Sequence, residues 1–135
     1  MLLTAPEFEE RDLSIPADLA RIGQARDWAA QAAEDFGLPE DERFHIKLAM
    51  SEAVTNAILH GSGSERDAVD LEVREEQDAL VFEVRDCGAD GRAYVDRLDD
   101  GQRGLELVAL VMDEVELDQR EQGSVLRFAK HRRAA

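Results

Sequence analysis

Apolar residues in the first half of the chain recur every three or four positions, the period of amphipathic helices. One helix is expected over 18–36, with Gly37 placed to end it. A second helix is expected over about 39–60, because Pro39 suits a first helical turn and Gly61 suits a helix end. The apolar stripe of this second helix consists of Ile46, Met50, Val54, Ala57 and Ile58.

Elsewhere apolar and charged residues alternate, which is typical of strands with one buried face. Pro16 is placed where a helix could begin, so an edge strand is expected just before it. We also expect two hairpins, joined across 75–79 and across 119–123. The predicted strands lie at about 9–15, 69–74, 80–85, 115–117 and 126–128.

Residues 86–101 show no sustained period and contain three glycines and five aspartates, so a long loop is expected there. A third helix is expected at 105–111. The resulting order is one strand, two helices, two strands, one helix and two strands. This order predicts an α+β two-layer sandwich, in which a mixed, mostly antiparallel sheet is covered on one face by about three helices.

Composition narrows the class of protein. The chain has 135 residues, of which 44% are hydrophobic, so a single domain over 1–135 is expected. A formal net charge of −15 argues against binding to nucleic acid or to an anionic membrane, because like charges repel. No apolar run approaches the ~20 residues that span a bilayer, and the first residues lack the features of a secretion signal. A single cysteine, Cys87, excludes an internal disulfide, so we expect a cytoplasmic protein.

The first candidate site lies on the second predicted helix. Glu52, Asn56 and His60 are spaced four residues apart and form one polar row. The row could be a solvated helix face. The apolar residues beside it, such as Leu59, instead favour a pocket, where a carboxylate can accept a proton and an amide oxygen can bind a hard cation.

Two glycine-containing segments are further candidates. Asp86 ends a predicted strand two residues before Gly88, where it could accept hydrogen bonds from a flat ligand or simply form an Asp-x-Gly turn. Gly101 and Gly104 precede the third predicted helix. Backbone N–H groups there could bind phosphate, or the glycines could serve only as a flexible link that caps the helix.

Taken together and in this order, these segments resemble the nucleotide-binding motifs of the Bergerat-fold, or histidine-kinase-like, ATPase superfamily. The resemblance is greatest to the anti-sigma factor serine kinases of bacterial partner-switching systems, and it covers nearly the whole chain. The matching segments are 48–61 for the first motif, 86–88 for the second, 104–117 for the third with its following strand, and 123–125 for the last.

The resemblance implies a protein serine kinase that uses ATP and Mg²⁺. Glu52 would be the general base that takes the proton of the attacking hydroxyl, Asn56 would bind Mg²⁺, and Asp86 would bind the adenine amino group. Residues 89–102 would act as a lid. The other residues that the resemblance assigns to the nucleotide are Thr55, His60, Gly88, Arg103, Gly104, Leu105 and Ser124.

The resemblance also implies partners. The phosphorylated substrate would be a STAS-type anti-anti-sigma protein, and the second partner a sigma factor; dimerisation is common in the family. Asp90 stands where the second motif usually has glycine, and Leu59 where other branches often have lysine. Such departures favour an alternative: a non-catalytic, nucleotide-responsive binding module that regulates a signalling partner by docking. If no nucleotide binds, a plain α/β sandwich with an unrelated role remains.

Overall fold

The computed structural model of the chain describes residues 8–88 and 98–133, and the side chains of all of these except 98–104. The helices within these ranges are α1 (Ile22–Phe36), α2 (Glu40–Leu59) and α3 (Leu98–Val111), with a short 3-10 helix at Leu19–Arg21. The strands within them are β1 (Arg11–Pro16), β2 (Ala68–Glu76), β3 (Ala79–Asp86), β4 (Glu114–Arg120) and β5 (Gly123–His131). None of the described helices is long and apolar enough to cross a membrane.

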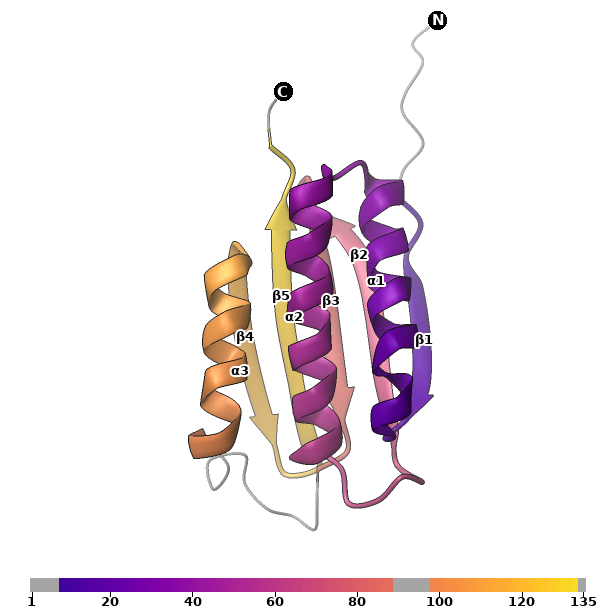
Figure 1. The fold of residues 1–135 in the computed structure, drawn as a ribbon, viewed down its shortest axis with the longest axis vertical. Coiled ribbons are helices and arrows are strands. Elements are labelled where there is room, and N and C mark those ends of the chain that lie inside the picture. Colours follow the sequence, from indigo (N-terminus) through magenta and orange to yellow (C-terminus); the bar gives the residue numbers. More distant parts are fainter. Residues whose placement is uncertain (1–7, 89–97, 134–135) are drawn as a thin grey trace, which may run out of the picture.

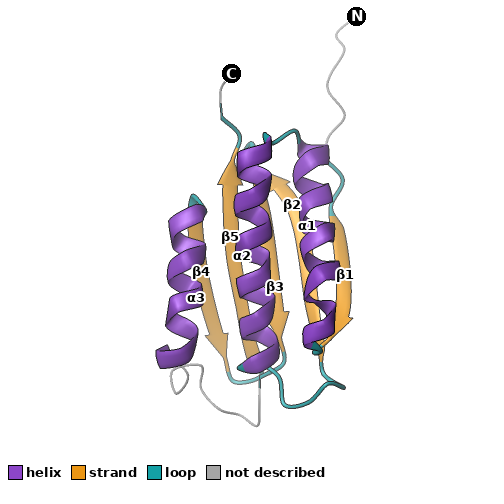
Figure 2. Ribbon diagram, in the orientation of Figure 1, coloured by secondary structure: helices purple, strands orange, loops and turns teal. Residues whose placement is uncertain are grey.

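The five described strands form one sheet in the order β1-β2-β3-β5-β4. Helices α1, α2 and α3 lie side by side over one face of this sheet, as Figure 1 and Figure 2 show. The predicted two-layer sandwich and its order of elements are confirmed. Every pairing among the described strands is antiparallel, so the sheet has none of the parallel pairs that a mixed sheet would contain.

The core fills the space between the sheet and the helices. Phe82 of β3 and Phe128 of β5 stack with their ring centroids 5.4 Å apart, and Trp28 of α1 packs edge-on against Phe82 at 6.2 Å. The inward positions of Phe82 and Phe128 follow from the alternation of apolar residues in their strands. The buried face of α1 otherwise consists of small residues that let the helix lie close to the sheet, ending in one aromatic residue: Ala25, Ala29, Ala32, Ala33 and Phe36.

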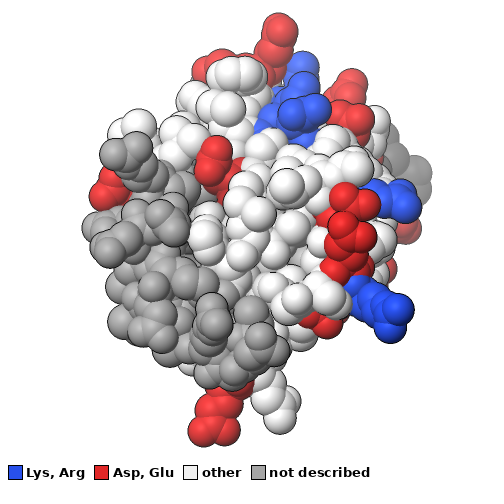
Figure 3. All heavy atoms as spheres, turned by 60° about the horizontal axis from the view of Figure 1, so that its bottom comes forward, with Lys and Arg blue, Asp and Glu red and all other residues white. Residues whose placement is uncertain are grey.

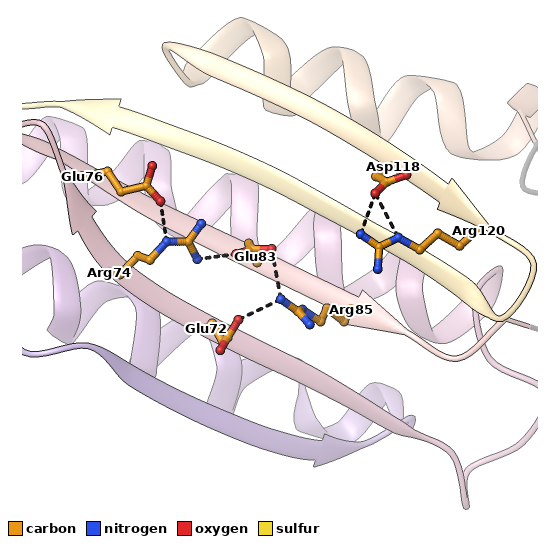
Figure 4. A network of polar contacts seen from close by, with 7 residues as sticks. All are labelled: Glu72, Arg74, Glu76, Glu83, Arg85, Asp118 and Arg120. Carbon is orange, nitrogen blue, oxygen red and sulfur yellow. Dashed lines mark hydrogen bonds and ion pairs between the residues drawn. The ribbon is translucent and has the colours of Figure 1, made fainter.

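The opposite face of the sheet carries charged side chains (Figure 4). Arg74 of β2 pairs with Glu76 and with Glu83 of β3, and Arg85 lies 3.2 Å from Glu72 and 3.3 Å from Glu83. Burial alone would raise the pKa of Glu83, but the hydrogen bond and the charge of Arg74 outweigh it, so the pKa lies below its ordinary value. This face is therefore covered by ion pairs and solvent instead of a second layer.

The prediction that Pro16 begins a helix is wrong. Pro16 is the last residue of β1 and pairs with Ala68 of β2. Its missing N–H is tolerated because β1 is an edge strand, with one side free of ladder hydrogen bonds. The helical segment begins after Asp18, whose carboxylate accepts a hydrogen bond from the N–H of Ala20 at 3.0 Å.

The predicted start of α3 is also wrong, because the helix begins at Leu98 instead of Leu105. Leu98 lies seven positions before Leu105 and so continues the same helix face. The two glycines of this segment suggested a loop, yet each costs only about 1 kcal/mol in a helix, and packing can supply that.

Candidate functional site

The predicted site residues come from elements that meet at one end of the sandwich, at the bottom of Figure 1. The C-terminal ends of α2 and β3 reach this end, as do the N-terminal ends of α3 and β5. The strand register places Asp86 of β3 opposite Ser124 of β5. The antiparallel fold therefore brings the first, second and last motifs together, although Asn56 and Ser124 are 68 positions apart along the chain.

Asn56 is the buried member of the polar row on α2. Its side chain is 5% exposed, and its Nδ2 has no hydrogen-bond acceptor among the described residues. An unpaired buried amide costs about 1–3 kcal/mol, so the alternative of a solvated face is wrong at Asn56. Glu52 and His60 are half-buried, and Glu52 pairs with no other described residue. Thr55, next in the chain, donates its hydroxyl to the carbonyl of Ser51 at 2.6 Å.

Hydrogen bonds from Gly88 and Ser124 orient Asp86 at the end of β3. Its Oδ1 accepts from the N–H groups of Gly88 and Ser124, both at 3.1 Å, and its Oδ2 accepts from the Ser124 hydroxyl at 2.8 Å. Ser124 is 6% exposed. The alternative of a simple Asp-x-Gly turn accounts for only the bond from Gly88, because the other two come from β5. The structure thus joins three residues that the motifs predict.

Two glycines pack against Asp86. A Cβ built on Gly61, just after α2, would lie 2.8 Å from the Cβ of Asp86 and closer still to its carboxylate. A Cβ built on Gly123 would lie 2.9 Å from the carbonyl carbon of Asp86, and the φ of Gly123 is +135°. The end of the Asn56 helix therefore rests on the carboxylate that ends β3. Gly61 was predicted to end the helix and to close the first motif, but its contact with Asp86 was not predicted.

Asp67 organises the connection from α2 to β2, and sequence analysis did not single it out. Its Oδ2 accepts from the N–H groups of Gly63 at 2.6 Å and Ser64 at 3.1 Å, and these bonds hold the pKa of Asp67 below its ordinary value. Burial raises the pKa of the Cys87 thiol, and a hydrogen bond to Asp67 raises it further. Cys87 is exposed, and its raised pKa disfavours the thiolate form.

Gly101 and Gly104 were predicted to precede the third helix, but both lie inside α3. Arg103 and Gly104 follow the first turn of the helix, so their N–H groups are not among the unpaired donors of a helix start. The structure describes only the backbone of Arg103 and Gly104. Leu105 is half-buried and packs against the core. Of the predicted lid, residues 89–97 lie outside the described residues, and 98–102 are helical.

Figure 3 looks onto this end of the molecule, where much of the described surface is uncharged and basic side chains stand toward the edge. No cluster of three or more His, Cys, Asp or Glu side chains able to hold a metal ion is found in the described residues. A Mg²⁺ ion here would depend on the oxygen of Asn56 together with phosphate and water oxygens. Mg²⁺ commonly binds in this way beside nucleotides, so the donor set fits the ion.

Residues 15–130 match the family model of the histidine kinase-like ATPase domain. The chain belongs to this family. The match spans all the described strands and helices except the first residues of β1 and the last residue of β5. The superfamily that the motifs predict is therefore confirmed.

Two bacterial relatives identify the branch of the family. The serine-protein kinase RsbW of Bacillus pumilus is 32% identical over 123 residues, which cover 78% of this chain and 76% of the relative. The serine-protein kinase RsbW of Bacillus velezensis is 29% identical over 121 residues, with the same shares of 78% and 76%. The chain therefore belongs with the RsbW-type proteins, as the resemblance to anti-sigma factor serine kinases predicts.

Solved structures agree on the fold. The RsbU and RsbW domains of Rv1364c from Mycobacterium tuberculosis match with a TM-score of 0.73 at 16% identity, covering 91% of this chain and 32% of that one. The histidine kinase domain from the Erythrobacter litoralis EL346 blue-light activated histidine kinase matches with a TM-score of 0.58 at 19% identity, covering 94% and 69%. This chain thus spans 32% of the length of the first structure. At these identities the likeness concerns the fold alone.

Proposed function

We propose that this chain is a protein serine kinase that uses Mg-ATP, phosphorylates a STAS-type anti-anti-sigma partner and sequesters a sigma factor in the cytoplasm. One observation carries the proposal: the buried, unpaired Nδ2 of Asn56 and the oriented carboxylate of Asp86 lie at the same end of the sandwich, where Gly61 approaches Asp86. Membership of the ATPase family supports the use of ATP. The RsbW relatives support serine as the acceptor.

The ends of β3 and β5 would bind the base. The carboxylate of Asp86, oriented by Gly88 and Ser124, is suited to accept a hydrogen bond from an amino group such as that of adenine. Gly88 lacks a side chain, which leaves room for a flat ring beside the turn. Thr55 and Ser124 would line the same side of the nucleotide.

Glu52 would act on the protein substrate. It lies on α2 about 6 Å along the helix axis from Asn56, and its carboxylate pairs with no other described residue. As the substrate serine oxygen bonds to the γ-phosphorus of ATP, the hydroxyl proton passes to Glu52. The bond between the γ-phosphorus and the bridging oxygen breaks, and ADP leaves. The carboxylate thus serves as a general base, which typically contributes about 10²–10⁴-fold.

Asn56 would hold Mg²⁺ through its amide oxygen. When bound, the ion supplies charge neutralisation to the phosphates. The Nδ2 of Asn56 would donate to a phosphate or water oxygen, which gives this buried donor the acceptor that it lacks. His60 at the end of α2, and Arg103, Gly104 and Leu105 on α3, complete the proposed nucleotide contacts.

Nucleotide state would decide which partner is held. This requires that the ATP-bound and ADP-bound forms differ in affinity for the sigma factor and for the STAS-type protein, because a ligand shifts an equilibrium only through differential binding. The net charge of −15 suits a basic surface on the sigma factor.

The second candidate function is a non-catalytic module that binds nucleotide and regulates a signalling partner by docking. Leu59 favours it, because this position is 55% exposed and apolar where other branches of the superfamily often have a cationic phosphate contact. Asp90 in the second motif favours it as well, although this residue lies outside the described part of the chain.

Transfer of labelled γ-phosphate to a STAS-type protein separates the two functions. We expect transfer by the wild type, loss of transfer with retained ATP binding in Glu52→Ala, and loss of nucleotide binding in Asp86→Asn. Asp41→Ala is the matched control, since Asp41 is an exposed acidic residue at the other end of α2. Equal transfer by Glu52→Ala would reject the assigned base. ATP binding by the wild type without transfer would favour the docking module.

A further inference from the structure

Lys130 occupies an inward-facing position of β5, where the alternation after Leu126 and Phe128 predicts an apolar residue. Its side chain is only 4% exposed. Its Nζ donates at 2.6 Å to the carbonyl oxygen of Val111, the last residue of α3. The same Nζ lies 3.4 Å from Nδ1 of His45 on α2, which can accept when it carries no proton. One buried ammonium group therefore links β5 to both α2 and α3.

A buried ammonium group is unfavourable unless its donors are satisfied, and an apolar residue would fill the same space without that requirement. The carbonyl of Val111 is one of the last four of α3, which have no partner within the helix. It also lies at the negative end of the helix dipole. Lys130 therefore caps α3 from the sheet, and its charged donor fixes the end of the helix at one point.

Other contacts hold the segment that follows α3. Asp113 accepts hydrogen bonds from the N–H of His131 and from Arg133, both at 2.7 Å. Arg133 also lies 3.1 Å from Glu42 on α2. These contacts attach the α3–β4 connection to β5 and α2, so this end of α3 is fixed on two sides.

Helix α3 runs from the end of the molecule that carries the proposed nucleotide site to the end that carries Lys130 (Figure 1). Its 14 residues give a length of about 21 Å, so a tilt of about 10° at the Lys130 end would move its first turn by about 3–4 Å. We propose that Lys130 is a positioning residue for the phosphate end of the site. It sets where residues 103–105 of α3 lie relative to Glu52 and Asn56 of α2. This inference rests on the proposed ATP site.

Lys130→Met tests the role, because methionine is close in length and lacks the charged donor. Arg127→Met is the matched control: it removes a cation from the outer face of the same strand, where Arg127 pairs with Glu76 at 3.0 Å. Calorimetry compares ATP with adenosine in the presence of Mg²⁺, because adenosine keeps the base contacts and has no phosphates. We expect Lys130→Met to weaken ATP binding at least tenfold and adenosine binding less than twofold. Arg127→Met should change neither by more than twofold.

Equal losses of the two affinities in Lys130→Met, or no loss of either, would overturn the positioning role. Amide hydrogen exchange without nucleotide gives an independent readout. We expect faster exchange in α3 of Lys130→Met with the sheet unchanged, and unchanged exchange in α3 would contradict the cap. If the wild type binds no nucleotide, the proposed function and the positioning role are both refuted. The hydrogen-exchange measurement needs no nucleotide, so it would still test whether Lys130 caps α3. If Lys130→Met does not fold, Lys130→Gln, which keeps an amide donor of shorter reach, replaces it in both measurements.

Discussion

Substitution of Gly61 by alanine should push the Asp86 carboxylate away from the end of α2. An added Cβ would lie 2.8 Å from the Cβ of Asp86 and closer still to its carboxylate, whereas ordinary carbon contacts are about 3.5–4 Å. In Gly61→Ala the carboxylate must therefore move by about 1 Å or more. Such a shift stretches the bond from the Ser124 hydroxyl, now 2.8 Å, beyond hydrogen-bond length.

The size of the effect follows from the bonds that Asp86 would lose. Hydrogen bonds to a charged acceptor contribute about 1.5–3 kcal/mol each. Loss of one or two should lower the free energy of unfolding of Gly61→Ala by about 3 kcal/mol. Displacing the carboxylate from the base should weaken ATP binding about 10- to 100-fold, since 1.4 kcal/mol corresponds to a factor of ten. Urea denaturation measures the first effect and calorimetry with Mg-ATP the second.

A matched control and a double variant sharpen this test. Gly23 lies in α1, where an added Cβ would meet only the end of the Arg26 side chain at 3.7 Å. Gly23→Ala should thus be neutral or stabilising by up to about 1 kcal/mol. In an Asp86→Ala background, Gly61→Ala should cost much less than in the wild type, because the atoms closest to the added methyl are gone. Wild-type stability and wild-type ATP affinity in Gly61→Ala would refute the reasoning.

Asn56→Leu should raise the free energy of unfolding of the nucleotide-free protein by about 1 kcal/mol, because it removes an unpaired buried amide. It should also abolish the Mg²⁺ dependence of ATP binding; denaturation and calorimetry check the two effects, and a destabilised variant would contradict the first. For Asp113, burial alone would raise the pKa, but the hydrogen bonds from the His131 N–H and from Arg133 bring it below its ordinary value of 3.8. Asp113 thus contributes stability above about pH 4 that is lost as the pH falls through the lower folded-state pKa. Asp113→Asn should flatten this acid limb of the curve of stability against pH, and an unchanged limb would count against the assignment.

The alternation of apolar and charged residues was enough to predict β2, β3 and the final hairpin, because a strand with one buried face must show it. Gly37 ends α1 in the left-handed region, as its position after the apolar stripe predicts. The start of α3 could not be predicted in this way. Two glycines in that segment lower its local helix preference, and the packing that overrides this preference depends on residues far away in the chain.

Within the site, the sequence predicted which motifs meet but not how their side chains are held. The burial of Asn56 depends on how α2 sits over the sheet, which no local pattern encodes. Asp67 accepts hydrogen bonds from Gly63 and Ser64, which are close to it in the chain, and only its bond to Cys87 is distant. Lys130 depends on the carbonyl of Val111, which is distant along the chain. A lysine at an inward-facing position of an alternating strand was a usable signal for the role of Lys130, since such positions normally hold apolar residues.

The alanine face of α1 makes this part of the layer unusually sensitive to added volume. Its four buried alanines have almost no methylene groups to lose, so truncation can do little harm there. Any larger residue must instead push the whole helix outward or crowd the strands beneath it. In a library randomised over α1, the variants that still fold should keep glycine, alanine or serine at these four positions. The exposed positions of the same helix should accept many residue types.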